Sequence, residues 1–288
     1  MKIKVVGIIG AGSMGTGIAQ ISAQKGFEVL VYDLKDEILE KSLGRIDKVL
    51  EKLTAKGKIT EEDKAKTMSR IKTSTNLEDF KEVDLIIEAV VENMEIKQTV
   101  FSKLDEICEE KTYFATNTST MSITKIATAT NRQAKFAGLH FFNPAPVMRL
   151  VEVIRGYYTS DETVKDLQDY VKALGKEGIE VKKDTPGFVV NRLMLPQFRE
   201  AYLVYEEGVA SLEDIDKAMK LGLNHPMGPF ELMDYTGLDI AYDSLVYLYG
   251  EFAQPNWSPP PALKRMINAG RFGMKAGKGW YDYDKKEK

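Results

Sequence analysis

An apolar run that ends at a glycine-rich turn constrains the fold of this chain more than any other feature. Residues 3–9 are apolar, Gly10-Ala11-Gly12-Ser13-Met14-Gly15 follows, and the periodicity predicts a helix over about 14–25. A G-x-G-x-x-G turn between a strand and a helix is typical of a dinucleotide site, because its glycines allow a tight turn, a close approach of pyrophosphate and close packing of helix on strand. The helix N-terminus would offer its N–H groups to the phosphates. A tight turn without a ligand is the alternative.

A second apolar run, residues 28–32, ends at Asp33, 18 residues after Gly15. A carboxylate at this position can accept hydrogen bonds from both ribose hydroxyls of NAD and would repel the 2′-phosphate of NADP. We therefore expect NAD as the cofactor. NADP is the less favoured alternative, because a nearby cation could offset the repulsion of its 2′-phosphate. A second alternative is that Asp33 is a surface residue with a structural role and no ligand.

The rest of the chain alternates short apolar runs with helical patterns up to about residue 185. The runs lie at 84–90, 112–116, 136–141, 150–154 and 178–182. Alternation of this kind predicts an α/β fold with a mostly parallel, Rossmann-type sheet. Residues 35–70 interrupt the alternation with two helical patterns around Gly57, and we expect them to form a helical hairpin that projects from the sheet.

The cluster Asp184-Thr185-Pro186-Gly187 is a strong breaker, and helical patterns dominate after it. We therefore predict two domains. Residues 1–185 would form the cofactor-binding and catalytic domain, and residues 186–288 an all-helical domain that closes a substrate cleft.

Composition excludes several classes of protein. The 288 residues carry 40 Lys+Arg against 43 Asp+Glu, and this balance argues against broad nucleic-acid binding. One cysteine, Cys108, forms no internal disulfide, and with only His140 and His225 the chain lacks the ligands of a usual structural zinc site, so no metal is expected. No apolar run reaches the roughly 18 residues that a membrane span needs, and we expect a cytoplasmic protein.

A histidine and a glutamate lie in neighbouring predicted strands. His140 is near the end of the run 136–142, where ligands collect in α/β sheets, and Glu152 lies between Val151 and Val153 in the next run. A carboxylate in an apolar strand is costly unless it has a partner. A His140–Glu152 pair would satisfy both and would suit proton transfer near neutral pH. A structural histidine is the alternative, and for His225, between helices, we favour a structural or exposed position.

Small polar and charged residues follow other predicted strands. Asn117-Thr118-Ser119-Thr120 could bind a ligand or could cap a helix. Glu92 and Lys97 could face the cofactor, although a cap and a surface ion pair would explain them nearly as well. Asn191 begins the first long helix after the domain boundary, where a ligand cleft is expected.

The first helix of the predicted hairpin carries basic residues at helical spacing, opposite its apolar side. They are Lys41, Arg45, Lys48, Lys52 and Lys56. A solvated face is the simpler interpretation, because acidic residues are interleaved. The alternative is a basic stripe that meets a phosphorylated ligand.

Taken together, the motifs resemble the 3-hydroxyacyl-CoA dehydrogenase family, and within it the stand-alone, clostridial-type 3-hydroxybutyryl-CoA dehydrogenases. The resemblance covers essentially the whole chain. It rests on VGIIGAGSMGTGIAQ, AVVENMEIK, ATNTSTMSIT, FAGLHFFNPAPVMRLVEVI, DTPGFVVNRLM and NHPMGPFELMDYTGLD. The last three motifs are the most distinctive.

The resemblance implies a role for each matching residue of the catalytic set. His140 would be the general acid/base and Glu152 its orienting partner. Ser119 and Asn191 would bind the 3-oxygen and the neighbouring thioester of the substrate. The implied reaction is reversible hydride transfer between NAD(H) and C3 of acetoacetyl-CoA or (S)-3-hydroxybutyryl-CoA.

The same resemblance implies binding residues. Asn143 and Glu92 would contact the nicotinamide ribose, with Lys97 nearby, and Asn117 would belong to the cofactor site. The hairpin would meet coenzyme A, with Lys52 and Lys56 as its contacts. The family's C-terminal helical domain also forms its dimer interface, so a homodimer or a higher homo-oligomer is expected.

Two rival functions stay open on the sequence. β-Hydroxyacid dehydrogenases, which act on free acids, share a dinucleotide domain followed by helices, but they use a lysine in a glycine-rich helix that we do not find here. A non-catalytic dinucleotide-binding protein on the same fold is the other rival. The intact set of Ser119, His140, Glu152 and Asn191 weighs against it.

Overall fold

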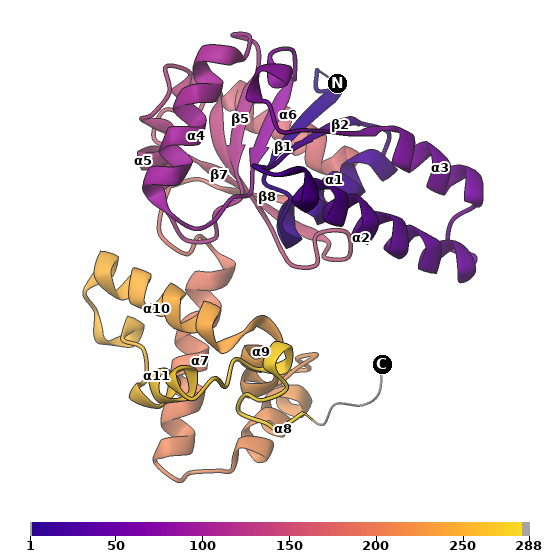
Figure 1. The fold of residues 1–288 in the computed structure, drawn as a ribbon. Helices are drawn as coiled ribbons and strands as arrows, with labels where there is room; N and C mark the ends of the chain where they lie inside the picture. The colour runs from indigo at the N-terminus through magenta and orange to yellow at the C-terminus, as the bar shows by residue number, and fades with distance from the viewer. Residues whose placement is uncertain (1, 284–288) are drawn as a thin grey trace. The chain divides into compact units, whose positions relative to one another are not determined.

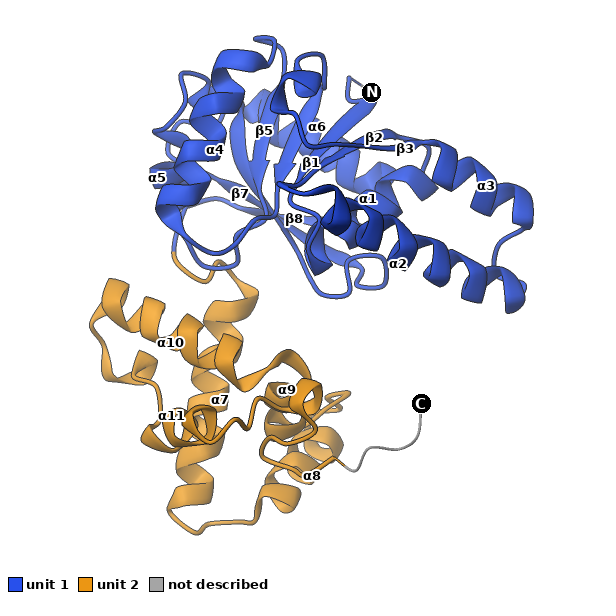
Figure 2. Ribbon diagram, in the orientation of Figure 1, with its two compact units in different colours: residues 1–185 blue, residues 186–288 orange. Residues whose placement is uncertain are grey.

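The structure is a computed structural model that describes residues 2–283, and the chain divides into two compact units (Figure 2). Unit 1 is Met1–Thr185 and unit 2 is Pro186–Lys288. The division falls inside the breaker cluster at 184–187. Each unit has its own hydrophobic core and is described by itself.

Unit 1 is built on one eight-stranded sheet with the order β3-β2-β1-β4-β5-β6-β7-β8 (Figure 1). The strands are β1 (Val5–Ile9), β2 (Glu28–Tyr32), β3 (Ile71–Ser74), β4 (Leu85–Glu88), β5 (Tyr113–Thr116), β6 (Phe136–Phe141), β7 (Leu150–Arg155) and β8 (Glu177–Val181). All neighbouring strands are parallel except β6 and β7, which are antiparallel. The predicted mostly parallel, Rossmann-type sheet is confirmed.

The strand β3 is not predicted from the sequence. Its four residues contain a single large apolar side chain, Ile71, followed by Lys72, Thr73 and Ser74. The strand lies at the edge of the sheet and pairs only with β2, in the register Val29↔Ile71. Edge strands need no continuous apolar run, because one side of their ladder faces away from the sheet.

Helices cover both faces of the sheet. They are α1 (Ser13–Gln24), α2 (Asp36–Ala55), α3 (Glu61–Ser69), α4 (Met94–Ile107), α5 (Ile123–Ala127) and α6 (Asp161–Ala173). Side chains of α1, α2 and α6 form one core with alternate residues of the strands. On α4, Phe101 packs against Phe114 and Phe136 of β5 and β6, at ring-centroid distances of 5.5 and 4.6 Å. Two apolar layers therefore enclose the sheet, as expected when strands are nearly continuous apolar runs.

Helices α2 and α3 form the predicted hairpin, which projects from the sheet (Figure 1). Leu39, Ile46 and Leu50 of α2 are buried, as their spacing predicts. Gly57, with φ +65°, follows α2 and lets the chain turn. Helix α3 begins with a capping box between Thr60 and Asp63, which satisfies two of its N-terminal N–H groups.

Unit 2 is helical, as predicted. Its helices are α7 (Val190–Glu206), α8 (Leu212–Gly222), α9 (Pro229–Thr236), α10 (Leu238–Phe252) and α11 (Pro261–Asn268). Pro229 is the first residue of α9, where its missing N–H costs no hydrogen bond. The core of the unit gathers apolar side chains of these helices around Phe230.

Two buried carboxylates tie unit 2 together. Asp216 accepts hydrogen bonds from the backbone of Phe230 (2.9 Å) and Glu231 (3.1 Å) and from the hydroxyl of Tyr281 (2.8 Å). Asp234 accepts from the backbone of Trp280 (2.8 Å) and from two further donors in the same segment. The final loops of the unit are thereby fixed to α8 and α9.

Among residues 2–283, every helix is too short or too polar to span a lipid bilayer.

Candidate active site

The glycine-rich turn joins β1 to α1 with the geometry that its three glycines predict. Gly10 has φ +106°, and a Cβ there would lie 2.7 Å from the carbonyl oxygen of Ala89. A Cβ on Gly15 would lie 1.8 Å from the carbonyl oxygen of Gly10, so helix and strand could not pack with any other residue. A Cβ on Gly12, in contrast, would meet nothing within 4 Å. The backbone at Gly12 therefore faces open space, as the approach of a pyrophosphate requires.

Helix α1 begins directly after this turn and has no side-chain cap and no acidic residue in its first turn. Ser13 and Met14 are its first two residues. Its N-terminal N–H groups and the positive end of its dipole are suited to an anion. The residues present therefore fit the diphosphate of a dinucleotide.

Asp33 follows β2 and contacts the glycine-rich turn. Its Oδ2 accepts a hydrogen bond from the backbone N–H of Ala11 at 2.8 Å, and its Oδ1 accepts one from Leu34 at 2.7 Å. Each carboxylate oxygen has a second lone pair, so these bonds orient the group and leave it able to accept further hydrogen bonds. The structure thus places the predicted ribose-binding carboxylate beside the predicted phosphate-binding turn.

His140 and Glu152 lie directly opposite each other on the antiparallel pair β6 and β7. Nδ1 of His140 is 2.6 Å from Oε2 of Glu152, and both side chains are buried. An ionised carboxylate only accepts, so Nδ1 carries the hydrogen of this bond, which fixes the tautomer and the orientation of the ring. The ring of Phe142 packs on the imidazole at a centroid distance of 4.5 Å. The predicted pair is therefore formed.

The loop after β5, called the Ser119 loop below, carries Asn117 and Ser119. The Asn117 side chain accepts a hydrogen bond from the backbone N–H of Phe141 at 2.9 Å, which ties this loop to the end of β6 beside His140. Glu92 Oε1 accepts from Thr118 Oγ1 (2.5 Å) and from the backbone N–H of Ser119 (3.1 Å). The structure therefore brings Asn117, Ser119 and Glu92 to one edge of the sheet.

Glu92 also belongs to a buried cluster of charges. Lys97 on α4 is 1% exposed, and its Nζ lies 2.7 Å from Oε1 of Glu88 and 3.1 Å from Oε2 of Glu92. A surface ion pair, one alternative for Lys97, is therefore wrong. A helix cap, the other alternative, is provided by Asn93 and not by Glu92. The Asn93 side chain accepts a hydrogen bond from Ile96 N at 3.0 Å at the N-terminus of α4.

Two carboxylates of this region are not among the predicted site residues. Glu88 ends β4, and its carboxylate binds Lys97, the backbone N–H of Val90 and the hydroxyl of Thr116, each at 2.7 Å. Asp184 accepts from Ser122 Oγ (2.8 Å) and from the first N–H groups of α5. A carboxylate at the end of an apolar run was the available signal for Glu88, whereas no comparable sequence signal marks Asp184.

The remaining predicted residues are spread over both units. Asn143 is exposed and follows β6, and its peptide bond to Pro144 is cis. Lys52 and Lys56 lie at the end of α2 and are exposed. The other members of the basic stripe, earlier in α2, are exposed as well. Asn191 lies in the first turn of α7 in unit 2. His225 follows α8 and is half-buried.

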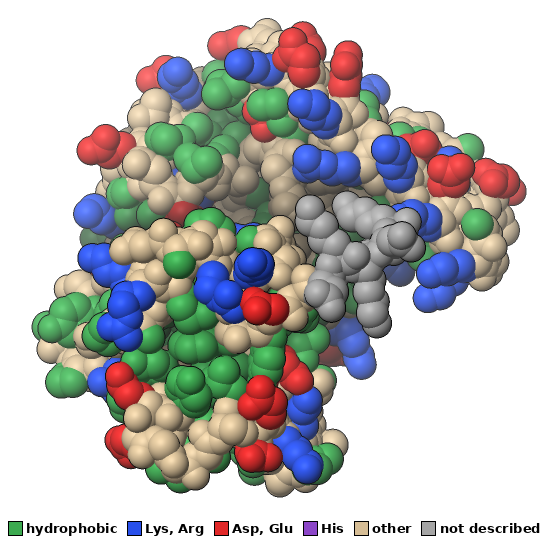
Figure 3. Space-filling view, turned by 60° about the horizontal axis from the view of Figure 1, so that its bottom comes forward, with side chains coloured by type: hydrophobic (Ala, Val, Ile, Leu, Met, Phe, Trp, Pro, Cys, Tyr) green, Lys and Arg blue, Asp and Glu red, His purple; other side chains and the backbone are tan. Residues whose placement is uncertain are grey.

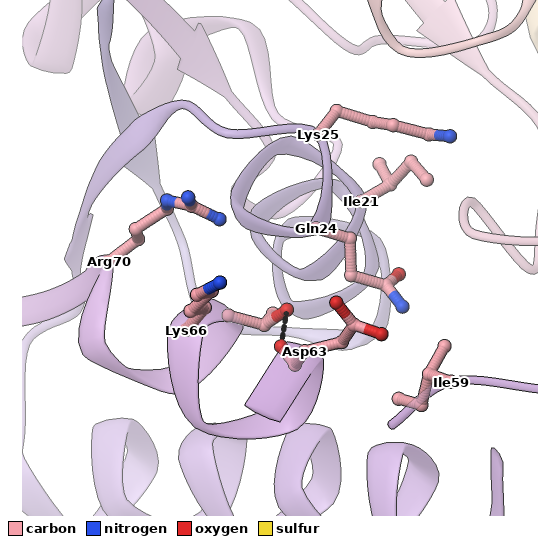
Figure 4. Close-up of a pocket in the computed structure, with 8 residues that line it drawn as sticks. Ile21, Gln24, Lys25, Ile59, Asp63, Lys66 and Arg70 are labelled. Carbon is pink, nitrogen blue, oxygen red and sulfur yellow. Dashed lines mark hydrogen bonds between the residues drawn. The ribbon is translucent and has the colours of Figure 1, made fainter. Parts of the chain in front are cut away.

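A hollow of ≈360 Å³ in unit 1 contains none of the predicted residues (Figure 4). It is lined by Ile21, Gln24, Lys25, Ile59, Asp63, Lys66, Thr67 and Arg70. It adjoins the C-terminal end of α1. The glycine-rich turn precedes the N-terminal end of the same helix, about 18 Å away along the helix axis. Figure 4 shows that the ammonium of Lys25 is directed away from Lys66 and Arg70, and Lys66 is paired with Glu62 at 2.6 Å. The hollow therefore has no part in the dinucleotide site.

Within the described part of the chain, no group of three or more His, Cys, Asp or Glu side chains is placed to hold a metal ion.

Comparison with known proteins gives full-length matches. Residues 5–185 match the family described as 3-hydroxyacyl-CoA dehydrogenase, NAD binding domain, and residues 187–283 match 3-hydroxyacyl-CoA dehydrogenase, C-terminal domain. The chain is 47% identical to a 3-hydroxybutyryl-CoA dehydrogenase of Clostridioides difficile over 96% of this chain and 99% of that one. It is 48% identical to the mitochondrial hydroxyacyl-coenzyme A dehydrogenase of Homo sapiens, over 98% and 91%. The crystal structure of an (S)-3-hydroxybutyryl-CoA dehydrogenase from Ralstonia eutropha is 47% identical and superposes with a TM-score of 0.94, over 98% of this chain and 100% of that one.

Proposed function

Because the chain belongs to the 3-hydroxyacyl-CoA dehydrogenase family, we propose that it interconverts acetoacetyl-CoA and (S)-3-hydroxybutyryl-CoA with His140 as the acid/base. Membership confirms the predicted class, an oxidoreductase that acts on a CH–OH group, and the predicted cofactor, NAD. The choice of a four-carbon substrate is supported by relatives at about 47% identity that are named for it.

The single observation that carries the catalytic proposal is the buried pair of His140 and Glu152, 2.6 Å apart on facing strands. Bound NADH supplies the hydride for C3 of the 3-oxoacyl thioester. His140 gives the proton that the 3-oxygen needs as it becomes an alcohol, and takes it back in the reverse direction. Glu152 holds Nδ1–H, so Nε2 is the nitrogen that exchanges the proton, and its carboxylate stabilises the imidazolium form.

The cofactor would lie along the edge formed by the glycine-rich turn and the loops after β2, β4 and β5. The turn Gly10–Gly15, including Ser13 and Met14, would bind the diphosphate, and Asp33 the adenosine ribose. Asn117, Ser119, Glu92 and Asn143 would surround the nicotinamide end, with Lys97 held behind Glu92. Support comes from the open space at Gly12 and from the contacts that join Glu92 to the Ser119 loop.

The substrate contacts are part of the same proposal. Ser119 and Asn191 would bind the 3-oxygen and the thioester, and a hydroxyl and an amide are suited to these neutral oxygens. Lys52 and Lys56 would meet the phosphates of coenzyme A from the exposed end of α2.

A homodimer formed through unit 2 is part of the proposal. Figure 3 shows hydrophobic side chains gathered on a face of this unit. Large apolar side chains of the unit that are exposed include Val209 (69%), Leu221 (77%) and Leu223 (62%). An apolar patch of this kind marks an interface more often than a solvated surface. Sedimentation at micromolar concentration would measure the mass, and a monomer would contradict the proposal.

A cytoplasmic location, which the lone Cys108 favours, is proposed with it.

Steady-state kinetics would test the function. We expect turnover of acetoacetyl-CoA with NADH, a larger kcat/KM for NADH than for NADPH, and no turnover of free 3-oxo acids. A longer 3-oxoacyl-CoA measured beside acetoacetyl-CoA would set the chain-length preference. Equal rates with free acids would favour the β-hydroxyacid dehydrogenase alternative, and tight NADH binding without any turnover would favour a non-catalytic protein.

A further inference from the structure

Glu88 is a fully buried carboxylate that the proposed chemistry does not use. It is 0% exposed, so it can touch neither cofactor nor substrate. Three donors on different segments hold it: Lys97 on α4, the backbone of Val90 and the hydroxyl of Thr116 at the end of β5. A carboxylate held from three sides is a fixed point in the structure, because any displacement breaks a charge-assisted hydrogen bond.

We propose that Glu88 is a positioning residue for the NAD site, which acts on the ligand through Lys97, Glu92 and the Ser119 loop. The inference rests on the proposed function for the place of the nicotinamide. Lys97 is buried with no access to water, so its ammonium stays where carboxylates hold it. Glu88 binds it from inside at 2.7 Å, and Glu92 from outside at 3.1 Å.

The charges of this cluster explain why Glu88 matters beyond holding the fold. Two carboxylates share one ammonium, so the cluster carries one excess negative charge. Because Glu88 compensates Lys97 from inside, Glu92 keeps Oε1 available to Thr118 Oγ1 and to the backbone N–H of Ser119. Without Glu88, Glu92 would be the sole counter-charge of a buried cation and would be drawn toward it.

The test is Glu88→Gln, which keeps the shape of the side chain and removes its charge. NADH binding, followed by the fluorescence of the bound cofactor, is a readout independent of turnover. We expect Kd for NADH to rise about tenfold, the effect of weakening one charge-assisted hydrogen bond, and kcat to fall. Asp166→Asn is the matched control, because Asp166 is a buried carboxylate of the same unit that binds Tyr113 and Lys2 away from Glu92. The control should lower Tm without changing Kd.

Glu88→Asp separates position from charge and protects the test against a variant that does not fold. It keeps the counter-charge of Lys97 but shortens the side chain by one methylene, so a positioning role still predicts weaker NADH binding. Wild-type Kd in Glu88→Asp, or in a folded Glu88→Gln, would overturn the inference. If the wild-type enzyme binds NADH but does not turn over acetoacetyl-CoA, the proposed function fails while the Kd values still judge Glu88.

Discussion

The two most deeply buried carboxylates of unit 1, Glu88 and Glu152, have partners of a different kind from those of the buried pair in unit 2, Asp216 and Asp234. In unit 1, Glu88 and Glu152 bind side chains that can carry a proton or a charge, Lys97 and His140. In unit 2, Asp216 and Asp234 accept hydrogen bonds from backbone N–H groups and from tyrosine hydroxyls. Burial of the carboxylate is nearly complete in all four.

The difference teaches that burial alone does not indicate a functional carboxylate. A carboxylate that binds neutral donors cross-links loops and helices, and its loss costs stability. A carboxylate that binds a titratable partner beside the proposed ligand site also sets the protonation and orientation of that partner, so its loss should change chemistry or ligand binding. The nature of the partner therefore separates the two classes, and each class makes a distinct prediction.

The largest effect is expected for His140→Ala. It removes the proton donor of the proposed reaction, and kcat should fall by roughly 10²–10⁴, the usual range for a positioned acid/base. Kd for NADH should change little, which fluorescence titration would check on the same preparation. His225→Ala is the matched control and should keep wild-type kcat. Turnover of His140→Ala within a few fold of wild type would remove His140 from this role.

Glu152→Gln should have the next largest effect. The variant keeps the volume of the side chain but no longer stabilises the imidazolium or fixes the tautomer of His140, and we expect kcat to fall about 10²-fold. NADH affinity should be nearly unchanged. A loss confined to NADH affinity would instead place Glu152 at the cofactor, and the comparison between the units would then need another explanation.

Asp33→Ala tests the cofactor site and should have a smaller effect on the kinetics. The carboxylate proposed to bind the adenosine ribose disappears, and with it the repulsion of a 2′-phosphate. We expect kcat/KM for NADH to fall about tenfold, the loss of one or two hydrogen bonds to a charged group, and the preference over NADPH to narrow. Because Asp33 also binds Ala11 N, Tm should be measured beside the kinetics. An unchanged NADH-to-NADPH ratio would contradict the argument.

Asp216→Asn should lower stability and leave chemistry nearly intact. Its amide cannot accept all three of the hydrogen bonds that Asp216 accepts, and we expect a loss of about 1–3 kcal/mol in the free energy of unfolding. Urea denaturation would measure it, and kcat of the folded variant should match wild type. A large loss of kcat at unchanged stability would break the comparison between the units.

The same variant makes a prediction about pH. Burial raises the pKa of Asp216 above its usual 3.8, so the native state holds this proton more tightly than the unfolded chain does. The contribution of the group to stability is therefore present below pH 3.8 and is lost as pH rises through its raised pKa. The difference in the free energy of unfolding between wild type and Asp216→Asn should accordingly shrink as pH rises through the raised pKa of Asp216. A difference that grows with pH would contradict the sign.

Much of this arrangement could be predicted from the sequence because it depends on local pattern. The glycine-rich turn, the apolar strands and the amphipathic α2 are each encoded in a short segment. The pairing of His140 with Glu152 could be predicted too, since both lie in apolar runs that place polar groups in a core, where each needs a partner.

What could not be predicted depends on contacts between distant segments. Lys97 lies on an amphipathic helix where a lysine reads as exposed, and only the packing of α4 on the sheet buries it beside Glu88. Asp184 caps α5 across about 60 residues of chain. The short edge strand β3 forms because β2 offers it a ladder, and its own residues give no apolar signal.

Cys108 extends the comparison to a buried titratable group whose hydrogen bond goes to a backbone carbonyl. It is 5% exposed, its thiol donates to the carbonyl of Phe80 at 3.4 Å, and burial raises its pKa to about 12. At pH 8 the thiolate would be about 10⁻⁴ of the total, and the thiolate is the reactive form. We expect no reaction of the native enzyme with a disulfide reagent on the time scale of an assay, and one equivalent of thiol in guanidinium. Fast labelling of the native enzyme would show that this part of unit 1 opens, and Cys108→Ser with unchanged kcat would confirm that the thiol takes no part in the chemistry.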